Sequence, residues 1–163
     1  MGLTEGENMN RRTWMQQFGL GGLAIMTPSS LWALEKITLT DSQWKQRLTE
    51  AQYYILRDEG TEPAGSSPLD KEYRKGEYRC AGCDLPLFTS EMKYDSGTGW
   101  PSFFQHIAGH VQTKRDFKLI WPRTEYHCAR CGGHQGHVFD DGPKPTGQRW
   151  CNNGLALVFI ADT

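Results

Sequence analysis

Four of the five cysteines in the chain form two Cys-x-x-Cys pairs that could bind one metal ion together. Each pair closes a short run of β-forming residues and belongs to a glycine-containing turn, which lets both sulfurs point at the same ion. Four thiolates in tetrahedral geometry favour zinc and leave no ligand position open for catalysis. We therefore predict a structural zinc site made of Cys80, Cys83, Cys128 and Cys131. Disulfides are the alternative, favoured in an oxidising compartment, and iron is chemically possible.

The fifth cysteine, Cys151, has no partner by spacing and stands two residues after Arg149. Its neighbours in RWCNNG are polar and turn-forming, whereas a cysteine that only fills a core lies among apolar residues. The thiolate is the nucleophilic form, and a nearby positive charge can lower the thiol pKa from about 8.5 to roughly 3.5–7.5. We therefore expect Arg149 to favour the Cys151 thiolate as a nucleophile. A buried, inert thiol is the alternative.

Acid–base groups lie close to this cysteine in the sequence. His134 and His137 are three residues apart in HQGH, and Gly136 between them would permit a close turn. Because four sulfurs already complete a zinc site, acid–base work is a better use for the two imidazoles than further metal ligation. Asp141 could hold a proton or orient a histidine, or could belong only to the turn before Gly142. Spacing alone leaves a Cys/His catalytic site and a purely structural interpretation equally open.

Two aromatic residues could shape a substrate pocket. The motif SGTGWPSF places Trp100 on a loop punctuated by glycine and proline, where an indole ring often faces a ligand. Phe139 alternates with His137 along a predicted strand, and therefore would share its face. The alternative for Trp100 is a ring that caps the core.

The elements that must position these groups are short. Two capping-box patterns, TDSQ from Thr40 and TEAQ from Thr49, predict two helices, the second ending at Gly60. Residues 61–70, TEPAGSSPLD, have the composition of a loop. The later runs EYRC, PLF, HVQT, FKLIW, TEYHC, HVFD and LALVFI predict short strands with no helix of useful length between them. We therefore predict a mainly β fold with mostly antiparallel pairing.

The chain has 163 residues, enough for one domain with an appendage, and its formal net charge of -1 gives no reason to expect a nucleic-acid partner. Residues 1–33 contain the pair Arg11-Arg12, a modest apolar stretch and small residues near Ala33. That order is typical of a twin-arginine export signal. We predict such a signal over 1–33, a domain over 34–163, and export to the periplasm or cell envelope. A cytoplasmic protein with an accidental arginine pair is the alternative.

Taken together, these motifs resemble the methionine sulfoxide reductases of the B type, which reduce the R epimer of methionine sulfoxide. The resemblance covers about residues 40–160 and rests on GTEP, YRCAGCDLPLF, KYDSGTGWPSF, YHCARCGGHQGHVFDDGPKPTGQRWCNN and LVF. It implies two antiparallel sheets with short N-terminal helices, and zinc on the four paired cysteines. It further implies a monomer that acts on oxidised methionine in proteins or peptides, with free methionine sulfoxide as a further candidate substrate.

The same resemblance implies a role for each candidate residue. The catalytic set is Cys151, His134, His137, Asp141, Arg149 and Asn153. The substrate-binding pair is Trp100 and Phe139, with the indole ring packed against the methyl group of the substrate. In this chemistry the cysteine thiolate attacks the sulfoxide sulfur, a histidine protonates the oxygen, and the cysteine becomes a sulfenic acid.

Thr98 is an informative departure from the family pattern. Many relatives carry a cysteine at this position, in SGCGWPSF, and that cysteine resolves the sulfenic acid as an internal disulfide. The four paired cysteines of this chain are committed to zinc in the prediction above, so none remains for that step. We therefore expect an external reductant, thioredoxin-like or another thiol, to reduce Cys151. Trp150, Asn152 and Gly154 also depart from the usual pattern, but they leave the catalytic set intact.

Two rival interpretations assign the chain no turnover. A zinc-knuckle binding module would present a basic stripe and exposed aromatics, and would leave Cys151 and Arg149 without a role. A redox sensor would use the reactivity of Cys151 but reduce no sulfoxide. Replacement of Cys151 separates these interpretations, since binding would survive the change and reductase activity would not.

Overall fold

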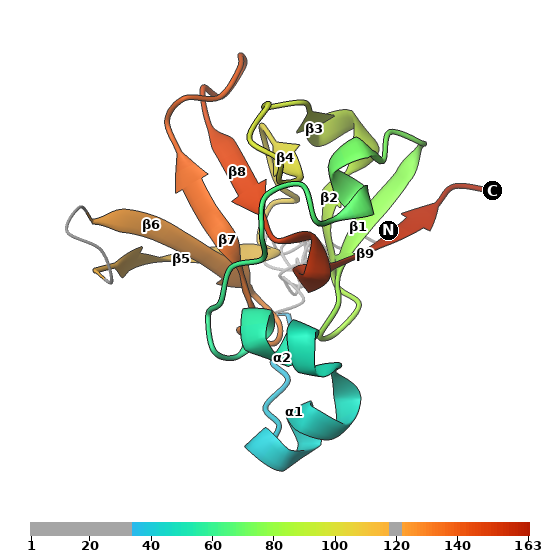
Figure 1. The fold of residues 1–163 in the computed structure, drawn as a ribbon, viewed down its shortest axis with the longest axis vertical. Helices are drawn as coiled ribbons and strands as arrows, with labels where there is room; N and C mark the ends of the chain where they lie inside the picture. The colour runs from blue at the N-terminus through green and yellow to red at the C-terminus, as the bar shows by residue number, and fades with distance from the viewer. Residues whose placement is uncertain (1–33, 118–121) are drawn as a thin grey trace, which may run out of the picture. The chain divides into compact units, whose positions relative to one another are not determined.

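The computed structural model describes residues 34–117 and 122–163 of the chain (Figure 1). The export signal predicted over 1–33 lies outside these residues, as does most of the FKLIW run. Among the helices within the described ranges, none is both long and apolar enough to cross a membrane.

Two short helices precede the sheets, and both begin where the capping boxes predict. They are α1 (Asp41–Arg47) and α2 (Glu50–Leu56). The hydroxyl groups of Thr40 and Thr49 accept hydrogen bonds from the third backbone N–H of each helix, and the glutamine at that position bonds back to the cap. The second helix packs against the C-terminal segment and β7, and thereby covers one end of the core.

The second helix ends earlier than predicted. Its last residue is Leu56, four residues before Gly60. The reason is local: Glu59 adopts a positive φ of 55°, and the N–H of Gly60 donates to the carbonyl of Tyr54 at 2.9 Å. The chain has therefore already left the helix when it reaches the glycine.

The smaller sheet has three antiparallel strands in the order β2-β1-β9. Its strands are β1 (Gly76–Cys80), β2 (Pro86–Thr89) and β9 (Leu157–Ala161). Three short 3-10 helices connect the elements, namely η1 (Pro68–Lys71), η2 (Ser90–Met92) and η3 (Gly154–Ala156). Because η3 takes the first residues of LALVFI, the last strand begins at Leu157 and not at the start of that run.

The larger sheet has six antiparallel strands in the order β3-β4-β8-β7-β6-β5. Its strands are β3 (Lys93–Tyr94), β4 (Ser102–Phe103), β5 (Val111–Asp116), β6 (Arg123–Cys128), β7 (His134–Phe139) and β8 (Arg149–Asn152). Two antiparallel sheets with short N-terminal helices confirm the predicted mainly β fold. Strands β3, β4 and β8 were not predicted, because β3 and β4 are only two residues long and β8 has a polar residue at each end.

Aromatic rings join the two sheets. Phe88 of the smaller sheet stacks on Phe103 of the larger one with ring centroids 4.0 Å apart, and Tyr78 meets Phe103 edge-on at 4.9 Å. On the larger sheet, Tyr126 contacts the ring of Trp150 at 5.0 Å. Such ring pairs add to the free energy gained by burying their area. The core therefore holds β8, the strand of Cys151, against the smaller sheet.

A buried carboxylate fixes the loop that follows α2. Glu62 is 3% exposed, and its two oxygens accept hydrogen bonds from the N–H groups of Gly154 at 2.6 Å and Leu155 at 3.0 Å. These donors open η3, whose first N–H groups have no partner within so short a helix. The bonds tie residues near position 62 to the C-terminal segment, about ninety residues later in the chain.

Replacing Glu62 should therefore destabilise the fold. We expect Glu62→Ala to lower the free energy of unfolding by about 3 kcal/mol, since two N–H groups lose their partner at about 1–3 kcal/mol each. Glu62→Gln should cost less, because its amide oxygen still accepts one bond. Urea unfolding followed by tryptophan fluorescence measures the change, with exposed Glu91→Ala as the matched control. Equal stability of Glu62→Ala and the control would contradict this role.

Candidate active site and metal centre

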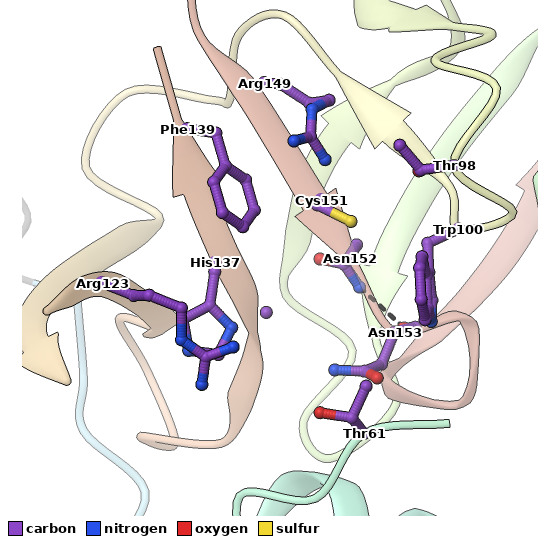
Figure 2. A pocket seen from close by; sticks show the side chains of 11 residues that line it. Thr61, Thr98, Trp100, Arg123, His137, Phe139, Arg149, Cys151, Asn152 and Asn153 are labelled. Atoms are coloured by element: carbon purple, nitrogen blue, oxygen red, sulfur yellow. Dashed lines mark hydrogen bonds between the residues drawn. The ribbon is translucent and has the colours of Figure 1, made fainter. Parts of the chain in front are cut away.

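A pocket of about 310 Å³ opens where β7 and β8 meet the loop before β4 (Figure 2). Its lining consists of Thr61, Thr98, Trp100, Arg123, Gly136, His137, Phe139, Arg149, Cys151, Asn152 and Asn153. Six of the eight residues predicted for catalysis or substrate binding belong to this lining. The two that do not are His134 and Asp141, and each contacts a residue that does.

Cys151 lies on strand β8, although its polar flanks indicated a turn. In the ladder it stands directly opposite His137 of β7 and Ser102 of β4. Burial raises the pKa of the Cys151 thiol, and Arg149, Thr98 and Ser102 offset only part of that effect. Arg149 therefore favours the thiolate, as expected, but burial has the larger effect and leaves the thiol pKa above its usual value.

Arg149 is occupied by a carboxylate, which explains its limited effect on the thiol. Its Nε and Nη2 donate to the two oxygens of Asp141, both at 2.8 Å. The guanidinium also lies over the ring of Phe139, 4.3 Å from the centroid. Asp141 therefore orients Arg149, whereas the spacing had suggested that it could orient a histidine.

His137 has a different acidic partner. Its Nε2 lies 2.8 Å from Oδ2 of Asp116, which also accepts a hydrogen bond from Nη2 of Arg123 at 2.8 Å. Burial lowers the pKa of His137, and the bond to Asp116 offsets part of this shift. The imidazole facing Cys151 is therefore neutral at pH 7.

His134 lies beneath the pocket and does not line it. It is 2% exposed, its Nδ1 lies 3.0 Å from Oε1 of Glu125, and its ring centroid is 5.5 Å from that of His137. Burial would raise the pKa of Glu125, but the bonds from His134 and Lys114 outweigh it and lower that pKa. His134 thus supports the ring of His137 from behind.

Hydroxyl groups surround the other side of the thiol. Thr98 Oγ1 lies 2.8 Å from Ser96 Oγ, which lies 2.7 Å from Ser102 Oγ. Both Thr98 and Ser102 favour the thiolate of Cys151 by hydrogen bonding. Thr98 therefore contacts the nucleophile from the position where many relatives carry a second cysteine.

The GTEP segment holds two further residues of the pocket. The indole Nε1 of Trp100 donates to the carbonyl of Glu62 at 3.1 Å, and the N–H of Glu62 donates to Oδ1 of Asn153 at 3.0 Å. The Asn153 side chain also donates to the carbonyl of Gln135 at 2.9 Å. Trp100 lies on a loop, as predicted, and its ring forms a wall of the pocket (Figure 2).

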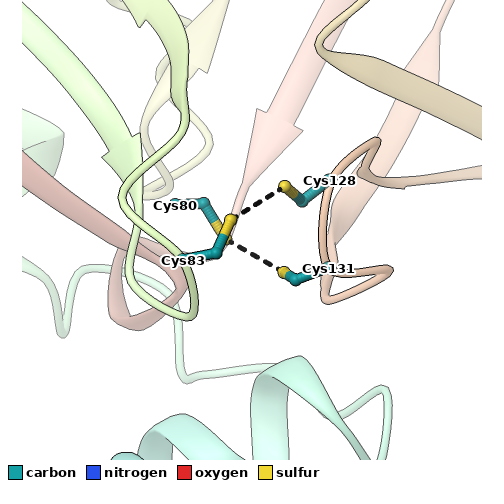
Figure 3. Close-up of side chains that lie close together, drawn as sticks. All are labelled: Cys80, Cys83, Cys128 and Cys131. Atoms are coloured by element: carbon teal, nitrogen blue, oxygen red, sulfur yellow. Dashed lines mark hydrogen bonds between the residues drawn. The ribbon is translucent and has the colours of Figure 1, made fainter. Parts of the chain in front are cut away.

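The four paired cysteines meet in one cluster (Figure 3). Their sulfurs all lie within 4.8 Å of one another, with closest approaches of 3.6 Å and 3.5 Å across the two pairs. Sulfurs bound at about 2.3 Å around one tetrahedral ion lie roughly 3.8 Å apart, so the spacing fits a metal site. All four cysteines are free, which argues against the disulfide alternative.

The cluster joins the two sheets. Cys80 ends β1 of the smaller sheet and Cys128 ends β6 of the larger one, so each sheet contributes one cysteine pair. Hydrogen bonds among the four thiols lower the pKa of Cys128 far below its usual range and raise the pKa values of Cys80 and Cys131. A metal ion that binds the cluster would displace the remaining protons, because it binds thiolates.

A chain of buried polar side chains runs from this cluster to the strand of the nucleophile. Gln135 Nε2 donates to Cys80 Sγ at 3.4 Å, and Asn152 Nδ2 donates to Gln135 Oε1 at 3.4 Å. Asn152 has a further partner in this series of hydrogen bonds: the hydroxyl group of Tyr126 donates to its Oδ1 at 2.6 Å. Gln135, Asn152 and Tyr126 are fully buried. The metal cluster and the pocket thus share one hydrogen-bonded interior.

The sequence analysis missed Thr61, Arg123 and Asp116. Thr61 belongs to the GTEP motif, and it went unremarked because a threonine in a loop carries no chemical signal. Arg123 and Asp116 are paired across β5 and β6. The feature that distinguishes them is the burial of Asp116 at the end of a strand whose other residues are mostly exposed. That feature is visible only once the register of the strands is known.

Comparison with known proteins agrees with this geometry. The SelR domain model matches residues 48–161. The chain is 50% identical over 125 residues to the peptide methionine sulfoxide reductase MsrB of Agrobacterium fabrum, covering 76% of this chain and 93% of that protein. It is 52% identical over 128 residues to the chloroplastic peptide methionine sulfoxide reductase B1 of Arabidopsis thaliana.

The matched region of the Arabidopsis protein covers 78% of this chain but only 63% of that relative. The corresponding protein of Leptospira interrogans is 49% identical over 125 residues, which cover 76% of this chain and 95% of the relative. The range matched by the SelR model includes the pocket, the four-cysteine cluster and the strands that carry them. The chain therefore belongs to the SelR family, the B-type peptide methionine sulfoxide reductases.

Proposed function

We propose that this protein reduces methionine-R-sulfoxide in peptides and proteins to methionine, with Cys151 as the nucleophile. The observation that carries the proposal is the position of Cys151 at the pocket, directly across the β7–β8 ladder from a neutral histidine, His137. The names of the relatives, which describe reductases of peptide methionine sulfoxide, support the same substrate class. A zinc-knuckle module without chemistry would give no reason for a pocket at this thiol.

The pocket walls suit a methyl sulfoxide. Trp100 and Phe139 offer apolar surface to the methyl group and the side-chain methylenes of the substrate, while Cys151 lies between them (Figure 2). Arg149 can donate a hydrogen bond to the sulfoxide oxygen, and His137 is placed to pass a proton to it. Asn153, held by Glu62 and Gln135, keeps the far wall in place.

In the reaction, the sulfur of Cys151 attacks the sulfoxide sulfur and two electrons pass from the cysteine to the substrate. The oxygen ends on Cys151 as a sulfenic acid, the proton of the thiol ends on that oxygen, and methionine leaves. Asp141 acts through Arg149, and His134 acts through His137, so both belong to the catalytic set as supporting residues.

Reduction of the sulfenic acid requires a thiol from outside the chain. Thr98 cannot form a disulfide, and the four remaining cysteines belong to the metal cluster. Two equivalents of an external thiol, supplied by a thioredoxin-like protein or another reductant, would return Cys151 to the thiol with release of water and a disulfide. The protein acts as a monomer and needs no nucleic acid in this scheme.

The four-cysteine cluster is proposed to hold one Zn²⁺. Its ligands would be Cys80, Cys83, Cys128 and Cys131, and no position would remain open for substrate. Bound zinc supplies folding free energy by joining the two sheets, and it takes no part in the redox step. The hydrogen bond from Gln135 to Cys80 is the kind of outer contact that orients a metal ligand.

The central test compares the two epimers. With dithiothreitol as donor, we expect the wild-type protein to reduce a peptide carrying methionine-R-sulfoxide and to leave the S epimer unchanged. Cys151→Ser should abolish turnover, because the hydroxyl cannot accept the oxygen. Chiral separation of the products measures both, on protein shown by metal analysis to carry one zinc ion per chain. Absence of turnover in zinc-loaded wild type would favour the binding module or the redox sensor, and active zinc-free protein would contradict the metal assignment.

The raised pKa of Cys151 predicts how the alkylation rate of its thiol depends on pH. Only the thiolate is alkylated, so the rate with iodoacetamide should keep rising through pH 9 and should show no plateau near neutrality. Arg149→Met should slow the reaction at each pH, and Arg149→Lys should not, because it keeps the charge. Peptide mass spectrometry of Cys151 gives the rates. A plateau below pH 8 would show that the thiol is already ionised in the free protein.

Export is the last part of the proposal. The Arg11-Arg12 pair and the apolar stretch that follows support a twin-arginine signal over residues 1–33, and therefore a place in the periplasm or cell envelope. Replacing both arginines with lysine should retain the protein in the cytoplasm of a bacterial host, as measured by cell fractionation. Cytoplasmic location of the unaltered chain would contradict export.

A further inference from the structure

Asp116 is a buried carboxylate at the end of an exposed strand. Residues 112–115 of β5 are exposed, whereas Asp116 is 8% exposed and lies against the wall of the pocket. Burying a carboxylate is unfavourable unless charged or hydrogen-bonding groups surround it. Here Oδ2 lies 2.8 Å from Nε2 of His137 and accepts a bond from Arg123 Nη2, also at 2.8 Å.

The register of the sheet explains why these groups meet. Asp116 is paired with Arg123 across β5 and β6, and His137 is paired with Cys151 across β7 and β8. The four strands are consecutive neighbours in the larger sheet. In the ladder His137 stands opposite Glu125 of β6, so Asp116, paired with Arg123 two positions along β6, reaches the imidazole diagonally across the sheet. Figure 2 shows His137 and Arg123 on one wall of the pocket, with Cys151 on the adjacent strand.

Hydrogen-bond chemistry then assigns the imidazole proton. An ionised carboxylate can only accept, so the nitrogen that faces Asp116 must carry the hydrogen. In a neutral imidazole the other nitrogen, Nδ1, holds a lone pair and can accept a proton. Among the described residues, Asp116 and Arg123 are the charged groups next to the ring, and the ring centroid of His134 lies 5.5 Å away. Glu125, opposite His137 in the ladder, is paired with His134 and Lys114.

We propose that Asp116 is a positioning residue that fixes His137 in the Nε2–H tautomer, so that Nδ1 accepts the thiol proton of Cys151 and passes it to the sulfoxide oxygen. The inference rests on the proposed function. It assigns the path of the proton without changing the balance: the thiol loses one proton to Nδ1, the cysteine sulfur is oxidised as the substrate sulfur is reduced, and the proton ends on the transferred oxygen. Asp116 stabilises the imidazolium that exists between the two transfers.

The pairing of His137 with Asp116 would provide the base that the buried thiol of Cys151 requires. The thiol of Cys151 is held in its neutral form in the free protein, and Arg149 is already paired with Asp141. A base is therefore required when the thiol attacks, and an acid is required when the oxygen leaves. One histidine with a fixed tautomer can serve in both roles, provided that a carboxylate holds its far nitrogen.

The direct test reads the tautomer by NMR. Long-range proton–nitrogen correlation of imidazole-labelled protein, assigned with His137→Gln, should show Nε2 protonated and Nδ1 bare in wild type at pH 7. Asp116→Ala should lose this pattern, and Asp116→Asn should keep it in part, because the amide oxygen still accepts. The Nδ1–H tautomer in folded wild type would overturn the proposal, and this measurement needs no substrate.

Steady-state kinetics of the Asp116 variants provide the second test. We expect Asp116→Ala to lower kcat by about a hundredfold, near the lower limit for general acid–base catalysis, with KM within about twofold of wild type. Asp116→Asn should fall between the two, and exposed Asp140→Ala should match wild type. A raised KM with unchanged kcat, or a loss no larger than in Asp140→Ala, would overturn the role. If wild type reduces neither epimer, the proposed function fails. The NMR measurement still tests separately whether Asp116 fixes the tautomer of His137.

Discussion

The close approach of β7 to β8 at Gly136 is the constraint on which the site depends. A Cβ atom on this residue would lie 1.9 Å from the carbonyl oxygen of Cys151, so any other side chain would force the strands apart. With glycine, the ladder sets His137 opposite Cys151 and Phe139 opposite Arg149. The glycine that had suggested a turn in the motif HQGH thus permits a strand contact, and that contact brings base and nucleophile together.

Two anchors hold this pair of strands from outside the pocket. The four-cysteine cluster joins the sheets and reaches β8 through the buried bonds of Gln135 and Asn152. The Glu62 carboxylate fixes the segment after β8 by its bonds to Gly154 and Leu155. Both anchors are polar and buried, so each is stabilising only while all its partners are present. A site built this way has little freedom to rearrange, which suits a reaction that needs one proton path.

The sequence predicted what local patterns control. The cysteine pairs predicted the cluster, because Cys-x-x-Cys spacing lets both sulfurs of a pair face one ion, and the capping boxes at Thr40 and Thr49 predicted where the helices begin. It could not predict that Asp116 reaches His137 or that Asp141 holds Arg149, because those contacts depend on strand register and not on nearness in the chain. The sequence also indicated that Arg149, two residues away, favours the Cys151 thiolate, and it does. It could not predict that burial on β8 raises the thiol pKa by more, because burial depends on the packed sheet.

The measurement that tests the account most directly is a single turnover without any added thiol. Reduced, zinc-loaded protein is mixed with an excess of a methionine-R-sulfoxide peptide, and the methionine formed is counted against the chain while dimedone traps sulfenic acid. The account predicts one methionine per chain, dimedone on Cys151 alone, and no disulfide to Cys151. Two oxidised cysteines joined in a disulfide, or dimedone on a residue other than Cys151, would contradict it.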